Sequence, residues 1–203
     1  VDTRSGTEGS VTVIGAVSPQ GGDFSEPVTQ NTQRFVRCFW ALDRSLAYAR
    51  HFPSINWNNS YTEYFNDLIP WYSENFGEDF TELRVRIMAL LNEESSLMEI
   101  VKLIGADILP DDQKLIIGTA KVIREGFLQQ NAFHATSMLR VILRLYDGAK
   151  DLVAQNIPLR QLVDTGVFTA LERMKFELGG GKPAAEFMEL VDNAVASVRR
   201  ANA

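Results

Sequence analysis

Apolar residues recur at spacings of three and four through most of the chain beyond residue 62. This spacing places them on one face of a helix and predicts a series of amphipathic helices. The stripes that carry the pattern are Phe80, Leu83, Ile87 and Leu90; Leu97, Ile100, Val101 and Ile104; Ile116, Ala120, Ile123 and Phe127; Met138, Ile142, Leu145, Ala149 and Leu152; and Phe187, Leu190 or Val191, Ala194 and Val198.

Helix start and stop signals divide these stripes from one another. Gly105 ends one stripe, and Pro110 with Asp111 and Asp112 begins the next, with carboxylates at the positive helix end. "LGGGKP" at 178–183 is the clearest linker. We therefore expect a mainly α chain whose larger part is an antiparallel helical bundle.

The first part of the chain has a different pattern. "VTVIGAV" at 11–17 is a short β-branched run that predicts a buried strand. After the loop "SPQGGDFSEP", Pro27 starts a helix whose apolar face continues to Leu46, and Pro53 ends the region. One strand cannot form a sheet, so we expect the rest of the sheet to lie outside this chain. The first residue is Val1 rather than Met, and we expect the chain to begin partway through a longer protein.

Composition argues against a nucleic-acid-binding protein, a disulfide-bonded protein and a membrane-spanning protein. The 203 residues are 45% hydrophobic and 23% charged, as in ordinary globular proteins. A formal charge of -6 argues against a nucleic-acid partner, which needs a basic surface. The single cysteine, Cys38, cannot form an internal disulfide, and its apolar neighbours predict that it is buried. No apolar run approaches the ~18 residues of a membrane-spanning helix.

Catalytic and metal-binding motifs are weak. "GGGK" at 179–182 does not match a Walker A loop, because Phe176 stands where a glycine is needed and Pro183 where Ser or Thr is needed. His51 and His134 have no nucleophile or metal-ligand pattern beside them. The acidic pairs at 93–94 and 111–112 are better explained by helix-terminus electrostatics than by a cation. We therefore predict no catalytic residue and no metal ligand in this chain.

Two phenylalanines are candidates for ligand binding. Phe52 in "HFPSINW" and Phe133 in "LQQNAFH" stand beside polar residues in stretches that are not helical. Composition alone favours two core residues. The alternative is a two-sided slot for a planar ring, since an aromatic face gains dispersion energy against a flat base.

Three long motifs together carry a family resemblance: "GSVTVIGAVSPQGGDFSEPVTQNTQR", "FWALDRSLAYARHFPSINW" and "FLQQNAFH". They closely resemble the catalytic A subunit (alpha chain) of V-type and archaeal-type rotary ATPases, in a prokaryotic form. The resemblance implies that residues 1–68 are the last part of a RecA-like α/β nucleotide-binding domain. Residues 69–203 would then be its C-terminal helical domain.

The resemblance also implies site residues. Phe52 and Phe133 match the phenylalanines of the family's adenine pocket. The loop from Ser18 to Pro27 matches a segment that faces the central rotor, which implies rotor contact at Gly21, Gly22, Asp23, Phe24, Ser25 and Glu26. The family's phosphate-binding loop, catalytic glutamate and magnesium-site acid all precede Val1. We therefore expect this chain alone to be inactive and to bind ATP or ADP with magnesium weakly at best.

The same resemblance implies the setting of the whole subunit. It would hydrolyse or make ATP, coupled to proton or sodium transport, in the cytoplasm at the periphery of the membrane. Its partners would be the B subunit in an alternating hexamer, the central rotor stalk and the ion-carrying membrane sector, with no nucleic acid. From the residues alone, a non-enzymatic helical interaction module remains the alternative.

Overall fold

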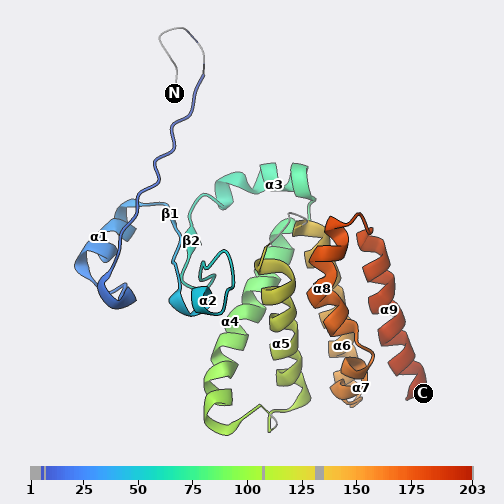
Figure 1. Ribbon diagram of the computed structural model, residues 1–203. Helices are drawn as coiled ribbons and strands as arrows, with labels where there is room; N and C mark the ends of the chain where they lie inside the picture. Colours follow the sequence, from blue (N-terminus) through green and yellow to red (C-terminus); the bar gives the residue numbers. More distant parts are fainter. Residues whose placement is uncertain (1–5, 7, 107, 131–134, 203) are drawn as a thin grey trace.

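The computed structural model describes residues 6, 8–106, 108–130 and 135–202 and is predominantly helical (Figure 1). Its elements, in chain order, are η1 (Gln20–Gly22), α1 (Pro27–Phe35), β1 (Cys38–Phe39), α2 (Arg44–Tyr48), β2 (Tyr61–Thr62), η2 (Asn66–Leu68), α3 (Ile69–Phe76), α4 (Phe80–Ile104), α5 (Asp111–Val122), η3 (Ile123–Leu128, a π-helix), α6 (Ala135–Ala154), α7 (Leu159–Asp164), α8 (Val167–Gly179) and α9 (Ala184–Ala201). Among the described residues, no helix has both the length and the apolarity that crossing a membrane requires.

The helices from α4 onward form the predicted antiparallel bundle. Helices α4, α5, α6, α8 and α9 lie side by side with alternating directions, and the short α7 closes one end (Figure 1). Helix α6 packs against α4, α5 and α9. The predicted boundaries are confirmed: Gly105 ends α4 with a φ of 84°, and α5 begins at Asp111 directly after Pro110. Residues 180–183 of the predicted linker lie between α8 and α9, while Leu178 and Gly179 belong to the end of α8.

One apolar core runs through the whole bundle. The largest side chains that it buries completely include Leu91, Leu115, Ile142, Leu145, Leu171 and Phe187, from α4, α5, α6, α8 and α9. Burying each such side chain contributes about 1.5–3 kcal/mol of transfer free energy. The helical stripes of the sequence are therefore the source of this domain's stability.

The residues before the bundle depart from the predicted pattern. Helix α1 begins at Pro27 as expected, but it ends at Phe35 instead of continuing toward Leu46, so that prediction is wrong. The chain instead forms a two-stranded antiparallel ladder in which Cys38 pairs with Thr62 and Phe39 with Tyr61. The Tyr61 hydroxyl donates to the carbonyl of Gln33 at 2.9 Å. The helix end is thus set by a tertiary contact.

Two further expectations for this region are wrong. Residues 11–17 form no strand, and Val13 is 88% exposed, because no described strand lies beside them to pair with their backbone. Cys38 is exposed instead of buried. Its side chain lies on the open face of the two-stranded ladder, while that of the next residue, Phe39, stacks on the Tyr61 ring.

Candidate functional site

The segment from Arg50 to Trp57 lies between α2 and β2 and contains Phe52, the first predicted site residue. Asp43 anchors it, accepting hydrogen bonds from Ser45 N at 2.7 Å and from Asn56 Nδ2 at 2.8 Å. The Ser45 hydroxyl also donates to Asp43 at 2.6 Å, and this bond together with that from Asn56 holds the pKa of the Asp43 carboxyl below its usual value. The peptide bond between Phe52 and Pro53 is cis.

Three hydrogen bonds dock this segment onto the π-helix η3 and the residues that follow it. His51 is buried, and its Nε2 lies 3.1 Å from the carbonyl oxygen of Arg124. A carbonyl can only accept, so Nε2 carries the proton. Gln130 N donates to the carbonyl of Phe52 at 3.1 Å, and Gln129 Nε2 donates to that of Arg50 at 3.2 Å. Three consecutive residues of the segment are thus hydrogen-bonded to the bundle. We call this contact between residues 50–52 and residues 124–130 the junction.

The Phe52 side chain points away from the core, with 56% of its surface exposed. The interpretation of Phe52 as a core residue is therefore wrong. The Phe52 carbonyl accepts the hydrogen bond from Gln130 N, and Gln130 stands three positions before Phe133 in the sequence. Phe133 itself belongs to 131–134, outside the described residues. The described part of the junction thus offers one exposed aromatic face.

Buried charges lie behind this junction. Glu94, in the middle of α4, is buried and forms an ion pair with Arg124 of η3. The helix-terminus explanation of the 93–94 pair is thus wrong, while that of Asp111 and Asp112 is confirmed by their place in the first turn of α5. Lys175 of α8 is only 6% exposed, and its Nζ donates to the carbonyls of Glu125 at 2.5 Å and Gln129 at 2.8 Å. Burial lowers the pKa of Lys175.

The predicted rotor loop lies at the opposite end of the described chain from the bundle (Figure 1). Gly21 and Gly22 have φ values of 67° and 78°, a backbone conformation that suits glycine. Asp23 accepts from Ser25 N at 2.9 Å and Ser25 Oγ at 2.6 Å, and these bonds lower the pKa of its carboxyl. Phe24 packs edge-to-face on Phe39 with ring centroids 5.8 Å apart. The loop is therefore shaped by these contacts, while Gly21, Gly22, Asp23 and Ser25 remain exposed.

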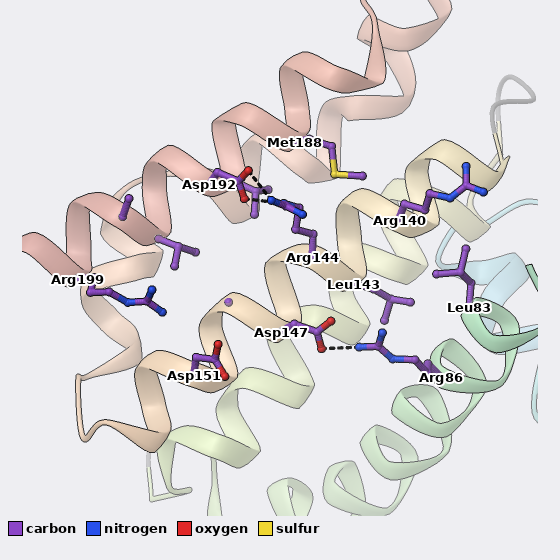
Figure 2. A pocket seen from close by; sticks show the side chains of 14 residues that line it. Leu83, Arg86, Arg140, Leu143, Arg144, Asp147, Asp151, Met188, Asp192 and Arg199 are labelled. Atoms are coloured by element: carbon purple, nitrogen blue, oxygen red, sulfur yellow. Dashed lines mark hydrogen bonds and ion pairs between the residues drawn. The ribbon is translucent and has the colours of Figure 1, made fainter. Parts of the chain in front are cut away.

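A separate groove of about 500 Å³ lies between α4, α6 and α9 (Figure 2). Arg144 of α6 forms a bidentate pair with Asp192 of α9 at 2.6 and 2.7 Å, and Arg86 of α4 pairs with Asp147 of α6. These pairs link neighbouring helices across the groove. Among the described residues, no three His, Cys, Asp or Glu side chains gather closely enough to hold a metal ion.

Two family models match the chain. Residues 2–62 match the nucleotide-binding domain of the ATP synthase alpha/beta family, and residues 69–158 match the C-terminal domain of V and A type ATP synthase. The alpha chain of the V-type ATP synthase of Halothermothrix orenii is 52% identical over 184 residues, which cover 86% of this chain and 31% of that protein.

Two A-type relatives agree. The corresponding chain of the A-type ATP synthase of Natronomonas pharaonis is 50% identical over 179 residues, covering 83% of this chain and 31% of the relative. That of the Methanosarcina barkeri A-type enzyme is 44% identical over 204 residues, covering 96% and 35%. The chain belongs to the V/A-type ATP synthase alpha (A) subunit family. It spans about a third of the length of these relatives and corresponds to the end of the nucleotide-binding domain and the C-terminal helical domain.

Within this family, the sequence pointed to Phe52 and the exposed loop but missed the buried charges beneath the junction. Lys175 went unnoticed although it lies among Leu171, Met174 and Leu178, which are all buried on α8. A charged residue inside an apolar helical stripe is a signal that could have identified it. Its partners could not have been found this way, because they are main-chain carbonyls some fifty residues earlier.

Proposed function

We propose that this chain provides the adenine-binding wall of the ATP synthase alpha chain and that Phe52 and Phe133 are the two aromatic residues of that wall. The observation that carries the proposal is the exposed Phe52 ring at a junction where the main chain on both sides is fixed. Such a ring can stack against a base without first being released from the core.

The phosphate chemistry is assigned to other parts of the subunit. Phosphoryl transfer depends on residues that position the γ-phosphate and its magnesium ion, and no Walker A pattern occurs in this chain. We propose that the chain alone neither hydrolyses ATP nor binds it tightly. The whole subunit would hydrolyse or synthesise ATP and couple this to proton or sodium transport. Release of phosphate by the purified chain, above that of a buffer control, would contradict the proposal.

The proposed setting follows from the same assignment. The domain boundary is placed at residue 68, between residues 1–68 and 69–203, and the two matched family ranges support it. The proposed partners are the B subunit, the central rotor stalk and the membrane sector, at the cytoplasmic periphery of the membrane; the relatives' names as ATP synthase components support this. Gly21 to Glu26 would contact the rotor, and the exposure of Gly21, Gly22, Asp23 and Ser25 supports that role.

Replacing the aromatic rings tests the adenine wall. In a full-length alpha chain that carries these residues, Phe52→Ala and Phe133→Ala should each lower the affinity for ATP by roughly five- to a hundredfold, because base–aromatic stacking contributes about 1–3 kcal/mol. Equilibrium binding of ATP and thermal unfolding are measured on the same samples.

Phe35→Ala is the matched control, since this phenylalanine is also exposed but lies on α1. It should leave ATP affinity unchanged. If Phe133→Ala lowers the melting temperature and leaves ATP affinity as it was, Phe133 is a core residue and the proposal fails.

A further inference from the structure

We infer that Lys175 is a positioning residue for the nucleotide site: its ammonium group holds the chain where it leaves η3 and so fixes the residues that contact Phe52. The inference rests on the proposed adenine wall and extends it into the bundle. Lys175 belongs to α8 and is buried, whereas the Phe52 ring is exposed.

All three donors of the ammonium group have acceptors. Lys175 Nζ donates to the carbonyl oxygens of Glu125 and Gln129 at 2.5 and 2.8 Å, and to Gln129 Oε1 at 3.3 Å. No carboxylate of the described residues forms an ion pair with it. A buried ammonium that bonds only to carbonyls and an amide acts as a fixed point for the main chain.

The carbonyls concerned lie at the end of η3, where the helix leaves acceptors without helical partners. The negative end of a helix also attracts a cation. The nearby main-chain bond from Gln129 N to the carbonyl of Arg124, at 2.9 Å, closes the last turn. Lys175 therefore determines where η3 ends and in which direction the chain continues.

Gln129 connects Lys175 to the segment that carries Phe52. Its side-chain oxygen accepts from Lys175, while its side-chain nitrogen donates to the carbonyl of Arg50 at 3.2 Å. The next residue, Gln130, donates its N–H to the carbonyl of Phe52. A path of two hydrogen-bonded residues thus joins α8 to the exposed aromatic ring.

Stability alone does not explain a lysine at this position. A methionine would fill much the same volume beside Leu171, Met174 and Leu178 without the cost of burying a charge. What methionine cannot do is donate hydrogen bonds to Gln129. The lysine is thus explained by the placement of the main chain at the site.

The test separates binding of the base from binding of the phosphates. In a full-length alpha chain carrying these residues, we compare the affinities for ATP and for tripolyphosphate, which has no base. Lys175→Met should lower ATP affinity roughly three- to tenfold and leave tripolyphosphate affinity unchanged, because a displaced aromatic wall loses part of its stacking energy.

Lys121→Met is the matched control. Lys121 is also close to η3 and α8, where it pairs with Glu172 at 2.8 Å and with Glu125 at 3.9 Å, but no bond joins it to Gln129. This variant should leave both affinities as they are. A general weakening of the bundle would instead change the two affinities together.

A second variant keeps the proposal testable if Lys175→Met does not fold. Gln129→Leu leaves Lys175 in place and removes the side-chain link to Arg50, and it should give the same base-specific loss in smaller measure. If either folded variant keeps the normal preference for ATP over tripolyphosphate, the positioning role is wrong while the adenine wall stands. If the unmodified alpha chain shows no such preference, the adenine wall itself is wrong, and this inference falls with it.

Discussion

The helical bundle buries its large apolar side chains, whereas the region before it leaves many of them exposed. In the bundle, large residues such as Ile142 and Leu145 are completely buried. In residues 11–17, before it, Val11, Val13 and Ile14 are largely exposed. The two regions belong to one chain of ordinary composition, so the difference lies in how each element satisfies its backbone.

A helix forms its backbone hydrogen bonds within itself and needs neighbours only on its apolar face. The bundle helices supply such neighbours to one another. A strand needs a second strand for every one of its backbone bonds, and residues 11–17 find none among the described residues. The comparison teaches that helices need neighbours only to bury an apolar face, whereas a run of strand-forming residues needs a partner strand before it can form a strand at all.

The largest expected effect tests this difference directly. Leu145→Ala should lower the free energy of unfolding of the chain by about 2–5 kcal/mol, because it leaves a cavity in the centre of the bundle. Ile14→Ala removes an exposed side chain and should change it by less than about 0.5 kcal/mol. Urea unfolding followed by circular dichroism measures both.

The same two substitutions, made in a longer chain, test whether residues 11–17 lack only their partner strands. In a full-length alpha chain, the cost of Ile14→Ala should rise toward that of a core substitution if neighbouring strands cover residues 11–17. An Ile14→Ala variant that is equally harmless in both contexts would contradict this interpretation of the region.

An intermediate effect concerns the packing of the bundle close to the junction. A Cβ added at Gly126 of η3 would lie 2.9 Å from the carbonyl oxygen of Leu171, so Gly126→Ala should cost about 1–3 kcal/mol of unfolding free energy. At Gly118 of α5 the nearest atom, of Phe168, would lie at an ordinary 3.4 Å. Gly118→Ala should therefore stabilise the chain by about 0.5–1 kcal/mol.

Opposite signs for these two glycines, measured by urea unfolding, would show that tight packing continues up to the junction. Equal effects would indicate instead that η3 can move away from α8. In that case the junction would resemble the open region before the bundle more than the bundle itself.

The smallest effect on stability is expected at the loop of Gly21 to Glu26. Replacing Asp23 with asparagine and Glu26 with glutamine should leave thermal unfolding of the chain nearly unchanged. An asparagine side chain at position 23 can still accept from Ser25, and Glu26 forms no side-chain cap on α1. The cost should appear in the assembled enzyme, as looser coupling between ATP use and rotation.

Single-molecule rotation of the reassembled complex measures that coupling. Normal rotation together with clear destabilisation of the isolated chain would make the loop a local structural element without a rotor contact. The loop would then resemble the bundle, whose important contacts lie within the chain.

The candidate site could be predicted from the sequence only in part. Phe52 was identified because it belongs to a long ordered motif, and the structure places its ring on the surface. The sequence did not reveal that His51, beside it, is buried against Arg124, since those residues are 73 positions apart. Nor could the exposure of residues 11–17 be predicted, because a β-branched run looks the same with or without a partner strand.

The sequence by itself determined the features that depend on neighbouring residues: the apolar faces of the helices, the start of α1 at Pro27, the end of α4 at Gly105 and the start of α5 at Asp111. Periodicity and capping act within a few residues, so they can be read along the chain. Only the tertiary structure decided that α1 ends at Phe35, that Glu94 pairs with Arg124, and that Lys175 holds Gln129. Each of these depends on a partner brought close by folding, and the chain between the partners carries no local signal of the contact.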